Sequence, residues 1–192
     1  PGLPVKSIKE LIVLAKAKPG YLICSVTGVG TFPGMSTELF IAMADIDVKR
    51  VQFKGGGPAV IDTMGGHSHI HFGTITTLIS HIKSGKIKAL GIGGLKRNAT
   101  LPDVPPISEA GVPGYESVNW WGIVAPTGTP QAIVDRVNKD LRAILALAEV
   151  QNLFLTQGAE ADYIGPDEFG KLIESETVKW AKVVKKANIQ PQ

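Results

Sequence analysis

Apolar and polar positions along the chain alternate between the spacing typical of strands and that typical of helices. Short apolar or alternating runs predict strands at 21–25, 48–53, 69–72, 87–92 and 118–125. Longer stretches, in which apolar residues recur every three or four positions, predict helices at 8–18, 32–44, 59–64, 74–84, 106–110, 130–147, 150–157 and 166–187. Strands that alternate with helices predict an α/β fold, with a largely parallel sheet and flanking helices.

The stretch from Ser25 to Phe40 (SVTGVGTFPGMSTELF) joins the first predicted strand to the next helix. Gly28 and Gly30 let the backbone in this turn approach a ligand closely, and Thr31 is placed to cap the helix. Backbone N–H groups at a helix start lack partners within the helix, so such a turn can bind a carboxylate or a phosphate. A tight strand–helix turn needs the same glycines without any ligand, so both interpretations stay open.

Two other strand ends are expected at the same edge of the sheet. The run KGGGP at 54–58 follows the second predicted strand, and Gly73-Thr74 follows the third. Parallel sheets bind ligands at the carboxyl ends of their strands. The three turns together therefore predict a binding site along this edge.

The composition is that of a globular protein, which narrows the function classes. The chain has 192 residues, of which 44% are hydrophobic and 19% charged, with a net charge of +3. The basic residues are scattered rather than clustered, so we expect no nucleic-acid partner. No apolar run is long enough to span a membrane. Cys24, the single cysteine, lies in an apolar strand, which favours an inert buried thiol.

Metal binding and covalent catalysis are weaker hypotheses. His67, His69 and His71 alternate and would share one strand face, but no neighbouring carboxylate or cysteine completes a zinc, copper or nickel site. Ser25 or Thr31 could act as a nucleophile only with a histidine and an orienting carboxylate, and no G-x-S-x-G elbow is present. The chain also lacks P-loop and dinucleotide-binding motifs. We therefore expect no metal, no cofactor and no enzyme.

Several stretches, in order along the chain, resemble one family. They are LPVKSIKEL at 3–11, AKAKPG at 15–20, the stretch 25–40, FKGG at 53–56, LPDVP at 101–105, EAGVPGY at 109–115, WGIVAP at 121–126 and E-x-x-KWAKVV at 176–184. Together they resemble the Bordetella-uptake-gene family, the periplasmic receptors of tripartite tricarboxylate transporters. The resemblance is specific because it spans the chain in the right order.

The resemblance implies a periplasmic solute-binding protein with two lobes that close around a hinge. Such a receptor captures a small carboxylate and delivers it to the membrane subunits of the transporter. The family holds the carboxylate without a salt bridge, by backbone N–H groups, hydroxyls and ordered waters. The ligand-binding residues implied here are Ser25, Gly28, Gly30, Thr31, Phe32, Lys54, Gly55, Gly56, Gly73 and Thr74.

Two departures from the family pattern shape the expectations. Family members begin with a signal peptide and most of a first lobe, so a periplasmic-binding-protein-like fold with most of one lobe absent is expected here. Residues 1–125 resemble the second ligand-binding lobe, and residues 126–192 resemble the hinge return and the C-terminal helices of the first lobe. Many members also have Phe-Asp-Asn where this chain has Phe72-Gly73-Thr74, which favours a plain carboxylic acid over an amino acid as ligand.

The apolar helices of residues 126–192 need a surface to pack against. We therefore expect a homodimer or a swapped assembly. The alternative function is an incomplete copy that binds no ligand and acts as an interaction or assembly module.

Overall fold

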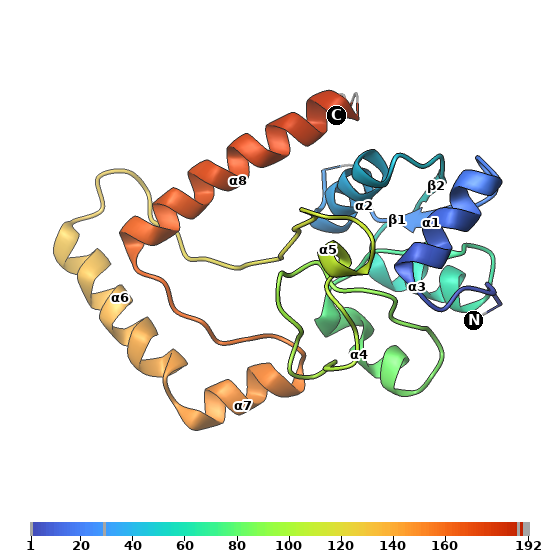
Figure 1. Ribbon diagram of the computed structural model, residues 1–192. Helices are drawn as coiled ribbons and strands as arrows, with labels where there is room; N and C mark the ends of the chain where they lie inside the picture. The colour runs from blue at the N-terminus through green and yellow to red at the C-terminus, as the bar shows by residue number, and fades with distance from the viewer. Residues whose placement is uncertain (1, 29, 188, 190–192) are drawn as a thin grey trace.

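A small parallel sheet lies at the centre of the N-terminal part of the molecule (Figure 1). The computed structural model describes residues 2–28, 30–187 and 189. Its sheet has the strand order β2-β1-β3, formed by β1 (Ile23–Val26), β2 (Lys49–Gln52) and β3 (Ile70–His71). All pairs are parallel, as the alternation of strands and helices predicts.

The helices begin and end close to the predicted positions. They are α1 (Ile8–Ala17), α2 (Phe32–Ala44), α3 (Gly56–Met64), α4 (Ile75–Lys83), α5 (Ile107–Ala110), α6 (Gln131–Leu145), α7 (Ala148–Thr156) and α8 (Pro166–Lys186). Side-chain caps define two of the starts. The Ser7 hydroxyl accepts a hydrogen bond from the Glu10 N–H at 3.2 Å, and the Thr31 hydroxyl accepts one from the Gly34 N–H at 3.3 Å.

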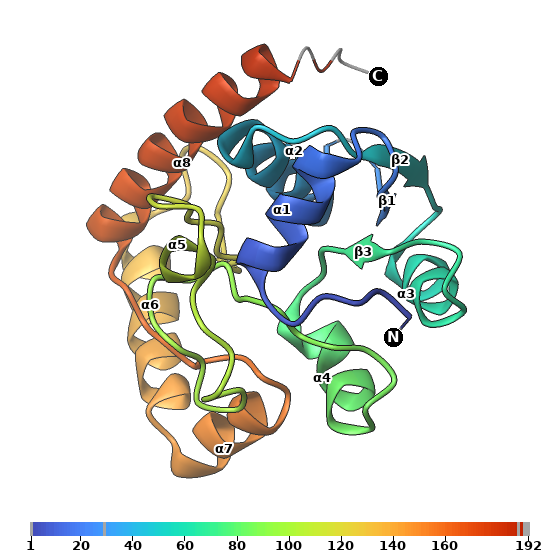
Figure 2. The ribbon, with the colours of Figure 1, turned by 45° about the vertical axis from the view of Figure 1, so that its right-hand side comes forward.

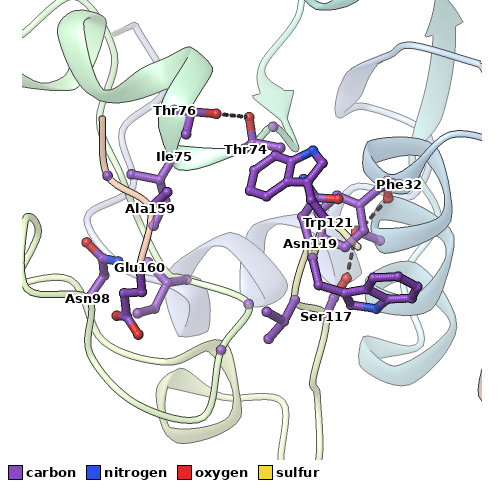
Figure 3. Close-up of a pocket in the computed structure, with 18 of the residues that line it drawn as sticks. Phe32, Thr74, Ile75, Thr76, Asn98, Ser117, Asn119, Trp121, Ala159 and Glu160 are labelled. Carbon is purple, nitrogen blue, oxygen red and sulfur yellow. Dashed lines mark hydrogen bonds between the residues drawn. The ribbon is translucent and has the colours of Figure 1, made fainter. Parts of the chain in front are cut away.

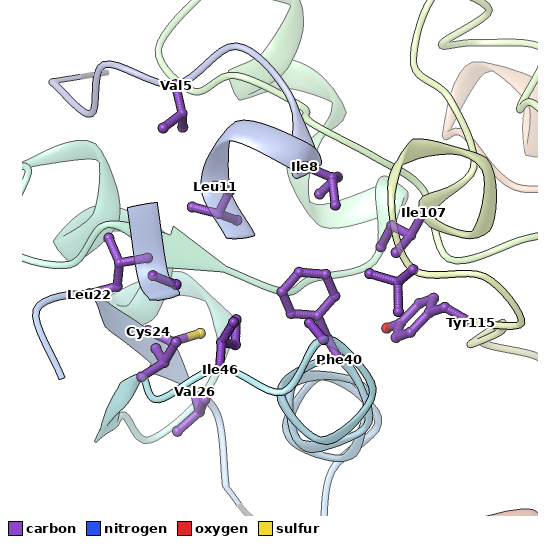
Figure 4. Packing of buried hydrophobic residues seen from close by; sticks show 14 residues of the cluster. Val5, Ile8, Leu11, Leu22, Cys24, Val26, Phe40, Ile46, Ile107 and Tyr115 are labelled. Atoms are coloured by element: carbon purple, nitrogen blue, oxygen red, sulfur yellow. The ribbon is translucent and has the colours of Figure 1, made fainter. Parts of the chain in front are cut away.

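The core lies where α1, β1, α2 and α5 meet (Figure 4). Leu11 of α1 and Leu22, just before β1, are almost fully buried. The Phe40 ring of α2 meets the Tyr115 ring edge-on, with centroids 6.1 Å apart. Burying an aliphatic or aromatic side chain of this size stabilises the fold by about 1.5–3 kcal/mol. This half of the chain therefore has a closed apolar core of its own.

Two predicted strands are wrong. Residues 87–92 form no strand, although Ile92 makes an isolated parallel bridge with Pro106. Residues 118–125 form no strand and make no backbone hydrogen bond to any described residue. Alternation of side chains indicates an extended backbone, but a sheet also needs a neighbouring strand, and these segments have none among the described residues.

The C-terminal helices cover little of the molecule. In Figures 1 and 2, α6 and α7 stand away from the sheet, and α8 returns alongside α2. No residue of α6 is buried, and Val183 is the one buried residue of α8. Phe169 and Trp180, the two large aromatic residues of α8, both keep partial exposure. Among the described residues, no helix combines the length and apolarity needed to cross a membrane.

Candidate functional site

A cleft of about 1520 Å³ separates the sheet-containing part of the molecule from the C-terminal helices. Its walls come from α4, the extended segment 118–125, α6 and residues 158–173. Most of the lining side chains are apolar. Figure 3 shows polar groups placed around it, namely Thr74, Thr76, Asn98, Ser117, Asn119 and Glu160.

The predicted ligand-binding residues do not all lie in this cleft. Phe32, Gly73 and Thr74 line it. The remaining predicted residues are not among its lining residues: Ser25, Gly28, Gly30, Thr31, Lys54, Gly55 and Gly56. The turns at the starts of α2 and α4 therefore lie at its edge, whereas the turn at the start of α3 does not.

The turn between β1 and α2 is built tightly around Thr31. The Thr31 hydroxyl donates to the carbonyl oxygen of Gly28 at 2.9 Å and lies 3.0 Å from the hydroxyl of Thr27. Gly28 has a φ of 114°, which favours glycine, and a Cβ at Gly34 would overlap the Gly28 carbonyl oxygen. The glycines therefore have a structural use whether or not a ligand is bound. Val29, in the same turn, lies outside the described residues.

Ser25 lies beneath this turn in a chain of hydroxyl groups. Its side chain has no exposed surface. The Ser25 hydroxyl lies 2.8 Å from the Thr63 hydroxyl, which lies 2.8 Å from the Ser68 hydroxyl. His71 Nδ1 lies 3.0 Å from both the hydroxyl and the carbonyl oxygen of Ser25. The Ser25 hydroxyl is thus fully engaged inside the protein and supports the turn from below.

Burial changes the acid–base behaviour of His71. It lowers the pKa of His71, because the charged imidazolium would lose its hydration, and the hydrogen bond to Ser25 opposes this only in part. His71 also lines the cleft. A neutral imidazole at this edge adds polarity without adding a positive charge.

The turn between β3 and α4 presents hydroxyl groups to the cleft. Thr74 precedes the first residue of α4, and its hydroxyl lies 2.8 Å from the Thr76 hydroxyl and 3.2 Å from the Thr77 hydroxyl. A Cβ at Gly73 would come within 3.0 Å of both the His71 ring and the Leu78 side chain. The first N–H groups of a helix have no partner within the helix, so this turn can hold an anionic group at short range.

The turn between β2 and α3 opens to solvent. Gly55 has a φ of 111°, and a Cβ at Gly55 or Gly56 would meet no atom within 4 Å. Lys54 is exposed. This turn lies on the predicted edge of the sheet, but the cleft does not reach it.

The histidines and the cysteine have structural roles. His69 Nδ1 accepts a hydrogen bond from the Ile23 N–H at 3.0 Å, which ties β3 to β1. Within the part of the chain that the structure describes, no group of three or more His, Cys, Asp or Glu side chains is placed to hold a metal ion. Burial raises the pKa of the Cys24 thiol to about 12, so it stays protonated and unreactive at neutral pH.

Sequence reasoning missed several polar residues of the cleft. Thr76, Asn98, Asn119 and Glu160 line it but were not predicted as site residues. Asn98 and Glu160 lie in irregular segments, where no periodic pattern indicates which way a side chain points. Thr76, two residues after Thr74 at the start of α4, could have been found from the predicted cap position.

A parallel α/β sheet with helix-start turns at the edge of a cleft defines a class of small-molecule-binding protein. Comparison with known proteins places the chain within that class. Residues 1–189 match the family described as the tripartite tricarboxylate transporter family receptor, and the chain belongs to this family. The predicted family is therefore confirmed.

Solved relatives share the whole fold of the chain. The R. palustris protein Rpa4515, solved with adipate, is 34% identical, with a TM-score of 0.89 over 100% of this chain and 64% of that protein. The periplasmic binding protein BugD is 30% identical, with a TM-score of 0.82 over 100% of this chain and 64% of BugD. The predicted periplasmic-binding-protein-like fold is therefore confirmed.

One curated relative is considerably longer than the region that it shares with this chain. A UPF0065 protein in the tcbD-tcbE intergenic region of Pseudomonas sp. (strain P51) is 32% identical over 180 residues, which cover 93% of this chain and 54% of that relative. The chain thus spans about half the length of this relative.

Proposed function

We propose that the chain is a periplasmic receptor that binds a small carboxylate for a tripartite tricarboxylate transporter. The observation that carries the proposal is the pair of threonine turns at the starts of α2 and α4, which flank one cleft at the carboxyl edge of the sheet. The fold match to a protein solved with adipate supports this ligand class. The match to a periplasmic binding protein supports the compartment.

The two turns suit a carboxylate by geometry and by charge. Helix starts carry a partial positive charge, and hydroxyls and backbone N–H groups can donate to carboxylate oxygens. We assign the inner contacts to Thr31, Phe32, Gly73 and Thr74. Gly28 and Gly30 shape the first turn, and Ser25 supports it from below through its hydrogen bonds to Thr63 and His71.

The turn formed by Lys54, Gly55 and Gly56 would act on the ligand from a greater distance than the two threonine turns. Lys54 is exposed at the same edge of the sheet, so its charge would attract an anionic ligand without fixing its position. The neutral Gly73-Thr74 pair leaves this turn without a carboxylate, which favours plain carboxylic acids over amino acids.

We further propose that residues 1–125 act as one ligand-binding lobe and residues 126–192 as a hinge return and part of the other lobe. A hinge motion would close the cleft over the ligand, and the closed form would be the one presented to the membrane subunits of the transporter. The cleft between the two parts is consistent with this division.

An incomplete copy that binds no ligand is the alternative. It is favoured by one observation, namely that Thr31 and the glycines around it lie outside the lining of a mostly apolar cleft. In that case the chain would act as an interaction or assembly module.

Thermal shift with a panel of mono-, di- and tricarboxylates separates the two functions. A matched control for each acid is its uncharged amide, in which every carboxyl group is amidated. Ligand present at 100 times its dissociation constant stabilises the folded state by about 2.7 kcal/mol. A shift with an acid but not with its amide supports the receptor, whereas no shift with any acid favours the non-binding module.

A further inference from the structure

The two ring nitrogens of His71 have different surroundings. Nδ1 points into the protein, where it lies 3.0 Å from the carbonyl oxygen and 3.0 Å from the hydroxyl oxygen of Ser25. Nε2 makes no hydrogen bond to any described residue, and a Cβ built on Gly73 would lie 3.0 Å from it. Nε2 therefore faces the Gly73-Thr74 turn, and Figure 3 shows Thr74 of this turn at the edge of the cleft.

Nε2 of His71 is also open to the cleft. Among the described residues that are not exposed, every fully buried side-chain nitrogen or oxygen atom has a hydrogen-bond partner. Nε2 has no such partner, so it is not fully buried, and His71 is one of the lining residues of the cleft. The cleft therefore has an unpaired polar atom beside the start of α4.

The hydroxyl groups around Ser25 fix which ring nitrogen carries the proton. The Thr63 hydroxyl donates its one proton to the Ala59 carbonyl oxygen at 3.0 Å, so it accepts from the Ser25 hydroxyl at 2.8 Å. The hydroxyl oxygen and the carbonyl oxygen of Ser25 both remain as acceptors for Nδ1. Two acceptors that face one nitrogen need a proton on Nδ1, so the neutral ring keeps its lone pair on Nε2.

We infer that His71 Nε2 accepts a hydrogen bond from a hydroxyl group of the ligand, so that the site selects hydroxycarboxylic acids over the same acids without the hydroxyl. This inference deepens the proposed function and rests on it, since the two threonine turns hold the carboxylate itself. An ionised carboxylate cannot take this position, because it has no proton to donate. Burial lowers the pKa of His71, which keeps the ring neutral and Nε2 an acceptor at neutral pH.

A hydroxyl group suits this acceptor better than an ammonium group does. The turn from Phe72 to Ile75 has no acidic residue, and the start of α4 carries a partial positive charge. An ammonium group would therefore lie beside positive charge without a carboxylate to balance it. An acid without a hydroxyl would leave Nε2 unpaired, or would have to retain an ordered water molecule there.

Calorimetric titration at neutral pH with pairs of acids of equal length tests the inference. The pairs are malate and succinate, 2-hydroxyglutarate and glutarate, and 2-hydroxyadipate and adipate. In at least one pair we expect the hydroxy acid to bind roughly 2- to 12-fold more tightly, as for one neutral hydrogen bond. The O-methyl ether of that hydroxy acid keeps the oxygen but has no proton to donate, so it should lose this gain.

The outcomes of the titration separate this inference from the proposed function. Equal affinity within every pair, or an ether that binds as tightly as the hydroxy acid, would overturn hydroxyl recognition and leave the carboxylate receptor in place. Tighter binding of aspartate than of malate would assign Nε2 to an ammonium donor and overturn the inference as well. Binding of none of these acids would overturn both proposals.

Two variants of His71 and the spectrum of its ring locate the contact. His71→Asn keeps a nitrogen donor near the place of Nδ1 but has no atom at that of Nε2, whereas His71→Gln has an amide group near Nε2. We expect the preference for the hydroxy acid to be lost in His71→Asn, retained at least in part in His71→Gln, and unchanged in the exposed control His67→Asn. An undiminished preference in His71→Asn would overturn the inference.

Nitrogen chemical shifts of the His71 ring in the unsubstituted protein give a test that does not depend on how the variants fold. We expect Nε2 to be unprotonated in the free protein, and its resonance to move on saturation with the preferred hydroxy acid and much less with the matching plain acid. A proton on Nε2 in the free protein, or equal movement with both acids, would overturn the inference.

Discussion

The hydroxyl oxygens of Ser36 and Ser117 lie 2.5 Å apart inside the protein and join α2 to the segment that enters the cleft. The Ser36 hydroxyl also lies 2.7 Å from the Phe32 carbonyl oxygen, and the Tyr115 hydroxyl donates to the Ser36 carbonyl oxygen at 3.1 Å. Burial raises the pKa of Tyr115, so it stays a neutral donor. The start of α2 is thus fixed to the base of the extended segment.

The Ser36–Ser117 contact should be measurable as a coupling energy. Ser36→Ala and Ser117→Ala each leave a buried hydroxyl without its partner, so each should lower the free energy of unfolding by about 1–3 kcal/mol. The double variant should cost less than the sum of the two. Urea denaturation of the four proteins measures this, with the exposed Ser175→Ala as control. Strict additivity would show that the contact contributes nothing.

Thr31 should matter for stability and for binding. Thr31→Ala removes the helix cap and should lower the free energy of unfolding by about 1 kcal/mol. If the Thr31 hydroxyl turns from the Gly28 carbonyl oxygen to donate to the ligand, the variant's binding free energy should weaken by a further ~1.5–3 kcal/mol. Thr31→Ser keeps the hydroxyl and should preserve both properties. Calorimetric titration with adipate checks this, and unchanged affinity in Thr31→Ala would remove Thr31 from the site.

Two glycines in helices should respond oppositely to alanine. At Gly34 a Cβ would overlap the Gly28 carbonyl oxygen, so Gly34→Ala should distort the first turn and destabilise the protein. At Gly170 in α8 nothing lies within 4 Å of an added Cβ, so Gly170→Ala should stabilise the protein by about 0.5–1 kcal/mol. Melting temperatures measure both changes. Equal effects would mean that the tight β1–α2 turn is not as described.

His71 should make stability depend on pH. Burial lowers its pKa in the folded state below the ordinary value of 6.5. The unfolded state therefore takes up a proton first as the pH falls. The free energy of unfolding should be highest above about pH 6.5 and decrease as the pH drops below it, until the folded-state pKa is reached. Denaturation at several pH values checks this.

A variant pair isolates the contribution of His71. His71→Gln should flatten the pH dependence in this range, whereas the exposed His67→Gln should leave it in place. A slope that survives in His71→Gln would assign the dependence to another group.

Local signals in the sequence were sufficient to predict the helices, strands and turns around the site. Ser7 and Thr31 cap the helices that their positions predict, and the glycine turns follow β1 and β2 as expected. These features depend on residues close together in the chain. The parallel sheet then follows from the alternation of strands and helices, so its carboxyl edge could be located in advance.

Features set by distant residues could not be predicted in the same way. Residues 118–125 have the alternation of a strand, but pairing depends on a neighbour that the local pattern does not reveal. Ser25 is the last residue of a predicted strand, and the family resemblance implies a role in ligand binding, yet Thr63 and His71 enclose its hydroxyl. Asn98 and Glu160 reach the cleft from irregular segments, and only the tertiary structure brings them together.

Amide chemical shifts of the isotope-labelled chain during titration with adipate test the central claim most directly. The uncharged diamide of adipic acid serves as the matched control. We predict saturable shifts at Thr31, Phe32, Gly73 and Thr74 with the acid and none with the diamide. Saturable shifts confined to other regions, or no shifts with any carboxylate in the panel, would contradict carboxylate binding at these two turns.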